Sequence, residues 1–374
     1  MLLTELPTPQ VLVDRLRLER NVQRMQEAAT AGGVRLRPHA KTHKSPWIAR
    51  RQIEAGAVGI CCAKLGEAEV FARAGIEDIR LPYPILPVHA ERVLDLLERC
   101  RLSIIVDHAE VAAEWSRQMT RAGRDLDVLV KVDVGFHRCG IDPRSAGAAE
   151  FVARVAELPG LRFRGLLSHA GHAYHASSPA ELLDIARAER DTLCGLADQV
   201  RGLGVGVEEI SVGATPSARH SAALEGLSEL RCGNYVFYDR TQAGLGAAAL
   251  DDCALTVLAT VVSRPARNRV ILDSGSKVLT NDGARGFGDT RGFGLVLPAS
   301  RENVPDDTLL VERLSEEHAT VHALTGWSAL EPGQRVRVLP NHACVVANMV
   351  DELALVRGET VLQMLPVAAR GCVR

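Results

Sequence analysis

The segment 37–44, with the sequence RPHAKTHK, surrounds Lys41 with other basic side chains. It follows an apolar run that is typical of a strand, and Pro38 biases the preceding Arg37 toward an extended backbone. Burial and neighbouring positive charge both lower the pKa of a lysine, which prepares its amine to form an imine with a carbonyl compound. By its position alone, Lys41 fits a solvated basic loop about equally well.

Polar side chains also follow three later strand-like runs. The segments are DVGFHRCG at 133–140, SHAGHAY at 168–174 and SVGATPS at 211–217. The C-terminal ends of the strands of an α/β barrel meet at one mouth, so we expect these side chains to lie near Lys41. His169 and His172 are then candidate catalytic groups in contact with a substrate. Thr215, together with RCGNY at 231–235, is typical of the loops that form a phosphate site in such barrels.

A second cluster combines an imidazole with a thiol. His342 and Cys344 lie two residues apart in the segment PNHAC, beyond a strand-like run at 335–339. If this strand continues to residue 346, both side chains face the same way and can share one ion. Nitrogen and sulfur ligands favour Zn²⁺ over Mg²⁺ or Mn²⁺, and two protein ligands leave positions open for water and a substrate hydroxyl. A buried cysteine beside a hydrogen-bonded histidine gives the same pattern, and His318 in LSEEH fits either a neighbouring position or a surface turn.

These segments need a scaffold that brings strand ends together, and the chain has the matching pattern. Short apolar or alternating runs lie at 34–37, 58–62, 78–81, 102–106, 128–133, 163–168, 209–213 and 235–239. A first helical pattern at 18–29 precedes them, and others lie between them at 66–74, 90–100, 109–122, 145–158 and 180–203. Strands that alternate with helices in this number predict a closed (β/α)8 barrel of the TIM type, an α/β fold.

The pattern changes beyond residue 245. Strand-like runs at 255–263, 269–273, 335–346 and 352–356 follow one another without long amphipathic helices between them. This arrangement predicts a second, mainly antiparallel β domain. We therefore expect a barrel over residues 14–245 and a β domain over residues 246–374, to which residues 1–13 add a strand.

Composition limits the partners and the location of the protein. The 374 residues carry a formal net charge of −2, and Lys and Arg are spread along the chain, which disfavours nucleic acid as a partner. No apolar run approaches the roughly 20 residues that cross a bilayer, and the N-terminus lacks the apolar core of a signal peptide. Nine cysteines without a regular framework indicate reduced thiols. We expect a cytoplasmic protein without a membrane partner.

Eight motifs, in their order along the chain, carry a resemblance to a known family. They are RPHAKTHK, DVGFHRCG, SHAGHAY, SVGATPS, RCGNYVFYD, DSGSK, LSEEH and PNHAC. Together they span nearly the whole chain and resemble pyridoxal-phosphate enzymes of the alanine racemase fold, in particular the group of eukaryotic-type D-serine dehydratase and D-threonine aldolase. The resemblance implies that Lys41 binds pyridoxal 5'-phosphate covalently. It also supports a divalent metal on His342 and Cys344, with Zn²⁺ in first place and Mn²⁺ or Mg²⁺ as alternatives.

The same resemblance implies the remaining contacts of the cofactor. Thr215, Gly233 and Asn234 are expected to hold its phosphate, and Arg138 and Tyr174 are expected to line it. Enzymes of this family place the β domain of one subunit over the barrel mouth of the other. We therefore expect a homodimer that binds a small D-amino acid, with the metal pair of each subunit facing the reactive lysine of its partner.

Departures from related enzymes narrow the expected reaction. Alanine racemases use a tyrosine of the β domain as a second base, whereas all four tyrosines of this chain precede that domain, so a racemase is disfavoured. Small non-catalytic pyridoxal-phosphate-binding proteins have no counterpart of the β domain. Aldolases of this family usually have aspartate where this chain has Cys344, whereas the dehydratases have cysteine. The resemblance thus implies dehydration of a β-hydroxy-D-amino acid such as D-serine to a 2-oxo acid and ammonia. Cleavage of D-threonine to glycine and an aldehyde, or dehydration of 3-hydroxy-D-aspartate, are the alternatives.

Overall fold

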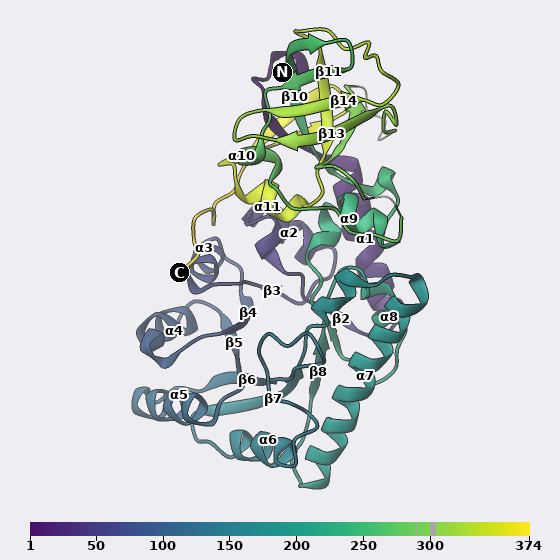
Figure 1. Cartoon of the computed structure of the whole chain (residues 1–374). Helices are drawn as coiled ribbons and strands as arrows, with labels where there is room; N and C mark the ends of the chain where they lie inside the picture. The colour runs from purple at the N-terminus through teal and green to yellow at the C-terminus, as the bar shows by residue number, and fades with distance from the viewer. Residues whose placement is uncertain (289, 300–303) are drawn as a thin grey trace.

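The chain folds into two bodies that lie one above the other in Figure 1. The computed structural model describes residues 1–288, 290–299 and 304–374. Within these residues, an eight-stranded parallel sheet forms the lower body, and a nine-stranded, mainly antiparallel sheet forms the upper one. This arrangement confirms the predicted α/β barrel with a second, mainly β domain.

The lower sheet closes into a barrel. Among the described residues its strands are β2 (Arg35–Leu36), β3 (Ile60–Cys61), β4 (Asp78–Pro84), β5 (Arg101–Val106), β6 (Leu126–Lys131), β7 (Leu161–Leu167), β8 (Glu209–Val212) and β9 (Glu229–Leu230). Their order is β2-β9-β8-β7-β6-β5-β4-β3. A parallel bridge between His39 and Cys61, and a 2.9 Å hydrogen bond from Val58 N to Leu36 O, join the two ends of this order. The C-terminal ends of the strands therefore share one mouth.

Helices cover the outside of the barrel. They are α1 (Arg15–Ala31), α2 (Pro46–Glu54), α3 (Leu65–Arg73), α4 (Ala90–Leu97), α5 (Ala109–Ala122), α6 (Ala148–Ala156), α7 (Pro179–Gly202) and α8 (Ala218–Ala222). The six helices that the sequence predicted are present, and α2 and the short α8 were missed. Only Ile48 and Ala49 mark the buried face of α2, because its third buried position is the polar Gln52. No helix in the described ranges is both long and apolar enough to cross a membrane.

The last barrel strand lies earlier than the sequence predicted. The expected strand at 235–239 is instead a short 3-10 turn, η5 (Asn234–Val236), which is followed by Tyr238 at a φ of 49°. Tyr235, Val236 and Phe237 are fully buried by packing rather than by strand pairing. The prediction failed because a continuously buried run lacks the alternation of apolar and polar residues that would distinguish a strand from a buried turn.

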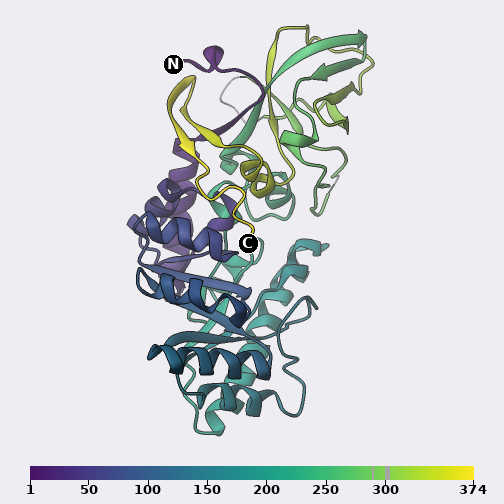
Figure 2. The ribbon, with the colours of Figure 1, turned by 90° about the vertical axis from the view of Figure 1, so that its left-hand side faces the viewer.

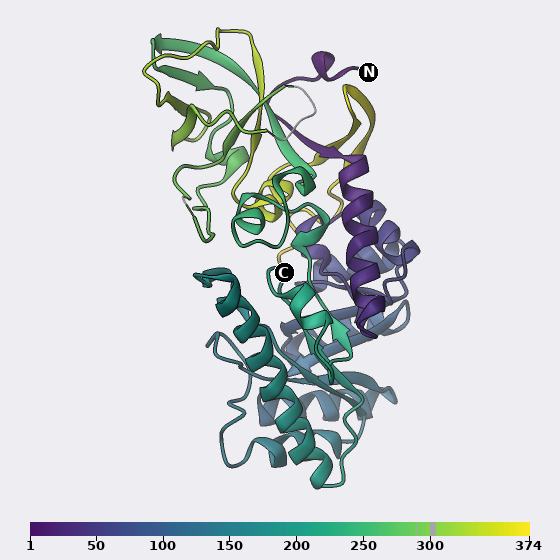
Figure 3. The ribbon, with the colours of Figure 1, turned by 90° about the vertical axis from the view of Figure 1, so that its right-hand side faces the viewer.

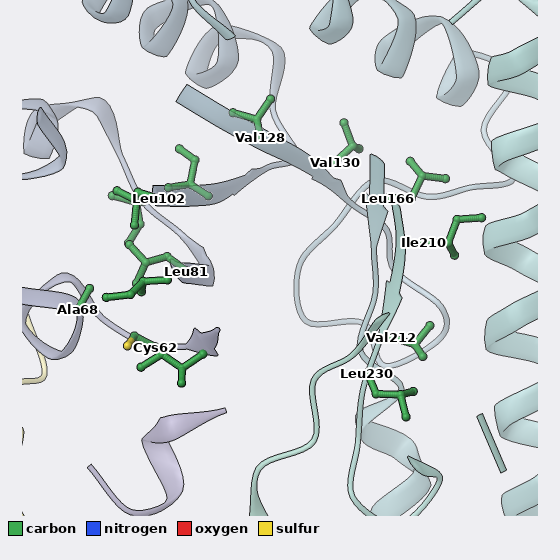
Figure 4. Close-up of a cluster of buried hydrophobic side chains, with 14 of the residues drawn as sticks. Cys62, Ala68, Leu81, Leu102, Val128, Val130, Leu166, Ile210, Val212 and Leu230 are labelled. Carbon is green, nitrogen blue, oxygen red and sulfur yellow. The ribbon is translucent and has the colours of Figure 1, made fainter. Parts of the chain in front are cut away.

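Strand alternation gives the barrel an apolar outside and a partly polar inside. Along β6, Val128 and Val130 point outward to the helices, and Figure 4 shows them among similar side chains of the other strands. Leu129 and Lys131 take the inward positions, where Leu129 belongs to a separate small apolar cluster. The inward row of β6 therefore ends in a buried amine at the mouth of the barrel.

Ion pairs fill the interior near the N-terminal ends of the strands. Arg80 donates to Glu229, and its Nη2 lies 2.8 Å from Glu209 Oε2. Glu229 also accepts from Arg37 Nε at 2.8 Å and from Ser211 Oγ at 2.7 Å. Burial alone would raise the pKa of Glu229, but the two arginines lower it to about 2. These paired charges join β2, β4, β8 and β9 beneath the mouth.

The upper sheet contains the N-terminal strand. Among the described residues its strands are β1 (Gln10–Asp14), β10 (Leu255–Ala266), β11 (Arg269–Leu272), β12 (Leu295–Pro298), β13 (Leu309–Leu314), β14 (Ala319–Ala323), β15 (Arg335–Leu339), β16 (Glu352–Arg357) and β17 (Thr360–Pro366). β1 is antiparallel to β10 and parallel to β16. The change of sheet between β9 and β10 supports a division into residues 14–245 and residues 246–374 with 1–13, which we retain as a proposal.

One predicted strand of the β domain is wrong in its second half. β15 ends at Leu339, and the chain continues into a short helix, α11 (Ala343–Asn348), instead of extending to residue 346. Pro340 explains the end of the strand, because proline has no N–H to donate to a ladder. The remaining short helices are η1 (Leu3–Glu5), η2 (Ala40–Thr42), η3 (Pro87–His89), η4 (Gly171–His175), α9 (Arg240–Gly244), η6 (Leu250–Asp252) and α10 (Ser276–Leu279).

Candidate active site

A cavity of about 560 Å³ opens at the mouth of the barrel, and residues of α11 in the β domain form part of its lining. Residues from both bodies line it. The predicted site residues among them are Lys41, Arg138, His169, Tyr174, Thr215, Gly233, Asn234, His342 and Cys344. A volume of this size is typical of a site for a small molecule or a cofactor.

Lys41 lies on η2, directly after the first barrel strand. Its side chain can be reached from solvent through the cavity, although protein groups surround the amine. Burial lowers the pKa of Lys41, Cys344 acts in the opposite direction, and Arg138 lowers it further. The nearby Lys44 is occupied by an ion pair with Glu67 at 3.1 Å. Lys41 therefore keeps an unprotonated amine at a lower pH than an exposed lysine does.

Asn348 ties α11 to the segment that carries Lys41. Its Nδ2 lies 3.0 Å from Lys41 O, 3.4 Å from Thr42 O and 2.6 Å from Cys344 O. The thiol and the lysine thus face one cavity within a single chain. The expectation that the metal pair faces the lysine of an opposite subunit is therefore wrong.

His342 and Cys344 lie at the start of α11 and not on a strand. His342 directly precedes the helix, and its Nδ1 lies 2.6 Å from Asp282 Oδ2. Cys344 Sγ lies 3.3 Å from both Thr42 Oγ1 and Asn234 Nδ2. Burial would raise the pKa of Cys344, but its contact with His342 brings the pKa below the ordinary value, which favours the thiolate. Because His342 Nδ1 is hydrogen-bonded to Asp282, the atoms available to an ion are His342 Nε2 and the thiolate of Cys344.

The donor set of this pair fits a metal ion with open positions. Among the described residues, no group of three or more His, Cys, Asp or Glu side chains is placed to hold a metal ion. An imidazole and a thiolate are ligands that suit Zn²⁺, and two protein ligands leave room for water and substrate. A carboxylate behind a ligating histidine commonly fixes its ring, as Asp282 does for His342.

Two glycines form a cradle beside β8 and β9. A Cβ on Gly213 would lie 2.9 Å from the Arg231 backbone, and a Cβ on Gly233 would lie 2.7 Å from His39 O. Both positions therefore need a residue without a side chain. Thr215 lines the cavity next to them. A close backbone approach with a neighbouring hydroxyl fits the phosphate of the implied cofactor.

The three other histidines named from the sequence have different surroundings. His169 lines the cavity, and its Nδ1 lies 2.5 Å from Gly213 O. Burial lowers the pKa of His169 well below its ordinary value, so the ring is neutral and leaves Nε2 as an acceptor. His172 is half-buried outside the cavity lining, and we assign it no role. His318 lies exposed in a surface turn between β13 and β14.

Sequence reasoning assigned no individual role to three buried charged residues around the cavity, although two of them lie in the motif RCGNYVFYD. Lys131 and Arg231 line it. Burial, with a contribution from Arg231, lowers the pKa of Lys131 to about 7. Asp239 accepts from Asn234 Nδ2 at 2.6 Å and from Ala343 N at 2.9 Å, so it connects the cavity to α11. The alternation along β6 could have revealed Lys131, whereas Asp239 was hidden in the wrongly predicted strand.

Comparisons with known proteins agree with this architecture. The family model described as "Alanine racemase, N-terminal domain" matches residues 13–241, and that described as "Putative serine dehydratase domain" matches residues 254–356. A D-threonine aldolase of Arthrobacter sp. is 34% identical over 99% of this chain and 94% of its own length. The chain belongs to the D-serine dehydratase and D-threonine aldolase family. It is thus a pyridoxal-phosphate-dependent lyase, and the resemblance carried by the eight motifs is confirmed.

Other relatives of this lyase include enzymes named for a different substrate. A D-threo-3-hydroxyaspartate dehydratase of Delftia sp. is 34% identical over 91% of this chain and 92% of its own length. A solved structure of that dehydratase has a TM-score of 0.91, is 31% identical and covers 98% of each chain. A cysteine-to-alanine mutant of the same dehydratase, solved in the metal-free form, has a TM-score of 0.92. The family therefore contains both aldolases and dehydratases.

The position of His342 and Cys344 gives a prediction about mixed subunits. If the lyase is a dimer, a hybrid of one Lys41→Ala subunit and one Cys344→Ala subunit is expected to stay inactive, because each cavity takes both residues from its own chain. Co-expression with two different tags isolates the hybrid, and its turnover is compared with that of a hybrid containing one wild-type subunit. Recovery of activity in the doubly mutated hybrid would show that the site is shared between chains.

Proposed function

We propose that this lyase removes water from a β-hydroxy-D-amino acid by β-elimination and releases a 2-oxo acid and ammonia. The observation that carries the proposal is one cavity that holds a lysine amine on one side and an imidazole–thiolate pair on the other. β-Elimination needs a base for the α-proton and help for the departing hydroxide. Lys41 would be the base for the α-proton, and a metal ion on His342 and Cys344 would assist the departing hydroxide.

The residues around Lys41 fit pyridoxal 5'-phosphate. Lys41 would hold the cofactor, the glycine cradle with Thr215 would hold its phosphate, and Arg138 and Tyr174 would line it. When bound, pyridoxal phosphate supplies a conjugated ring that absorbs the electrons released at the α-carbon. Lys41 Nζ, with its lowered pKa, then takes the proton from the α-carbon. His169 has a neutral ring with Nε2 as an acceptor, which suits it to contact the substrate.

The pair at the start of α11 fits a divalent ion, with Zn²⁺ as the first candidate and Mn²⁺ or Mg²⁺ as alternatives. Held by His342 and Cys344, such an ion would supply Lewis-acid chemistry that favours the departure of a β-hydroxyl as hydroxide. Thr42 and Asn234 hold Cys344 Sγ in place, and Asp282 holds the His342 ring. A related dehydratase is described in a metal-free form, which supports metal binding within the family and agrees with a metal at this site.

The aldolase reaction is the second candidate, because a relative that is 34% identical is named D-threonine aldolase. In that reaction the bond between the α-carbon and the β-carbon breaks, and glycine and an aldehyde form. Incubation of the holoenzyme with D-serine, D-threonine and 3-hydroxy-D-aspartate separates the two. We expect the 2-oxo acid and ammonia in equal amounts, without glycine. Glycine with an aldehyde as the main products would replace the dehydratase proposal by the aldolase one.

We also retain the homodimer as a proposal. It rests on the family resemblance, and sedimentation of the purified holoenzyme tests it directly. A monomeric mass for the active enzyme would contradict it.

Asp282 gives a test of the metal site that does not depend on turnover. Asp282→Asn keeps the size of the side chain but removes the charge that faces His342 Nδ1. We expect the affinity for Zn²⁺ to fall about 10- to 100-fold, which is typical for loss of a partner of a ligating histidine. Competition with a coloured chelator measures the affinity, and Asp306→Asn, on an exposed loop of the same domain, is the control. Unchanged affinity in Asp282→Asn would argue against His342 as a ligand.

A further inference from the structure

The lining of the cavity is rich in positively charged side chains. Its cationic side chains are Lys41, Lys44, Lys64, Lys131, Arg138, Arg231 and Arg285, and its carboxylate is that of Glu67. Lys44 is paired with Glu67, and burial lowers the pKa values of Lys41 and Lys131. Cys344 is the other acidic group of the lining, so cationic side chains still outnumber acidic ones around the cavity. The lining is therefore suited to an anionic ligand.

Arg285 stands apart from the other cations because the β domain provides it. Residues 280–288, which follow α10, extend from the β domain toward the N-terminal end of α7, as Figures 2 and 3 show from two sides. Arg285 N lies 3.3 Å from Thr241 Oγ1, and Phe287 N donates to Gly244 O at 2.9 Å. Both contacts are to α9. The backbone around Arg285 is thus fixed while its side chain extends into the mouth.

The guanidinium of Arg285 has a weak protein partner. Its Nη1 lies 3.2 Å from His175 Nε2 on η4, and within the described part of the chain no carboxylate lies within 4 Å of it. By comparison, Arg37 and Arg80 are each paired with carboxylates in the barrel interior. A guanidinium offers two parallel donors that match a carboxylate, and a single imidazole nitrogen satisfies only one of them. Arg285 therefore has donors available for an anion that enters the cavity.

The side of the cavity on which Arg285 lies indicates which group of the substrate it meets. Asp282, three residues earlier on the same segment, holds the ring of His342. His342 and Cys344 face the β-hydroxyl in the proposed reaction. A second substituent on the β-carbon must lie next to that hydroxyl, and thus toward the segment that carries Asp282 and Arg285.

We propose that Arg285 binds a carboxylate attached to the β-carbon and so selects a dicarboxylic β-hydroxy-D-amino acid over D-serine and D-threonine. This inference rests on the proposed function, because it uses the position of the β-hydroxyl. Arg285 is thereby a specificity residue, and His175 only supports its side chain when no substrate is bound.

Ligands without a β-hydroxyl test this role apart from turnover. D-Aspartate and D-alanine differ by the second carboxylate, and the absorbance of the bound cofactor reports binding of both to the holoenzyme. We expect the wild-type enzyme to prefer D-aspartate by at least about 10-fold, and Arg285→Gln to lower this ratio by roughly 10- to 100-fold, as for loss of a charged hydrogen bond. Arg285→Lys, which keeps the charge without the two-pronged geometry, should give an intermediate ratio.

Two further variants separate recognition from support. His175→Ala removes the contact of Arg285 but keeps the guanidinium, so the ratio should persist; Lys64→Met removes another cation of the lining and should also keep it. No preference in the wild-type enzyme, a preference that survives in Arg285→Gln, or an equal loss for both ligands would overturn the proposal. Turnover of D-serine without that preference would leave the proposed function intact and remove only the role of Arg285. Absence of turnover with every β-hydroxy-D-amino acid would instead refute the proposed function.

Discussion

Lys41→Ala is expected to lower turnover by about 10²- to 10⁴-fold, the range for loss of a positioned general base. The variant should also lack the visible absorbance of a lysine-bound cofactor, because Lys41 would both hold the cofactor and take the α-proton. Glu67 occupies the neighbouring Lys44, so that lysine does not replace it. Turnover of the preferred substrate and an absorbance spectrum of each variant after loading with pyridoxal phosphate measure the two effects.

Chemical labelling identifies the lysine independently of any variant. Borohydride reduces the imine and fixes the cofactor to its lysine, and peptide mapping should then find the label on Lys41. Lys64→Ala is the matched control, because Lys64 also lines the cavity but stacks on Tyr83, with its Nζ 3.8 Å from the ring centroid. A label on Lys44, Lys64 or Lys131 would refute the assignment, and so would full activity in Lys41→Ala.

The pH dependence of cofactor loading follows from the surroundings of Lys41. Because burial lowers the pKa of Lys41, its amine stays unprotonated below the pH at which an exposed lysine gains a proton. Reloading of the cofactor-free enzyme should therefore continue at a lower pH than the ordinary lysine pKa would allow, and it should slow as the pH falls through the pKa of Lys41 in the folded protein.

Removal of the metal is expected to stop the departure of the β-hydroxyl while removal of the α-proton continues. Chelation, His342→Ala or Cys344→Ala should lower product formation by at least about 100-fold, since a Lewis acid supplies several kcal/mol of stabilisation to a departing oxygen. The cofactor spectrum should change little, because Lys41 and the glycine cradle are untouched. Exchange of the α-proton with deuterated solvent, followed by mass spectrometry of recovered substrate, should continue without the ion.

Metal replacement then tests the ligand set. Zn²⁺ should restore the chelated wild-type enzyme better than Mg²⁺, because sulfur is a poor ligand for a hard ion. Cys344→Asp should shift the preference toward Mn²⁺, whereas Cys344→Ser, which keeps the size of the side chain, should bind Zn²⁺ weakly. A chelated enzyme that dehydrates its substrate at the full rate would show that the pair is not catalytic.

Much of the barrel followed from local pattern, because strands and helices of ordinary length alternate along it. The mouth residues after β6, β7 and β8 were found since barrel geometry alone places strand ends together. The segment after Leu230 was misread because a buried apolar run has no period of its own. That single error concealed Asp239, whose contacts depend on it lying in a loop.

The site contacts between the bodies could not have been read from the sequence. Asp282, Arg285 and Asn348 are ordinary polar residues in segments without a motif. Each is assigned to the site by a contact with a residue far away in the sequence. The motif PNHAC predicted that His342 and Cys344 lie together, but on the wrong element. A helix start brings the two side chains together as well as a strand would, so the structural error leaves the proposed metal site possible to test.

The hydrogen bonds of Asn348 have a consequence for the interpretation of every variant proposed at positions 41 and 344. Asn348 donates hydrogen bonds to the main-chain carbonyl oxygens of these residues and not to their side chains. Truncation of either side chain therefore leaves the connection between the barrel and the β domain in place, and a loss of rate in such a variant reports missing chemistry. Asn348→Ala should behave in the opposite way: both reactive groups remain, but the distance between them is no longer fixed.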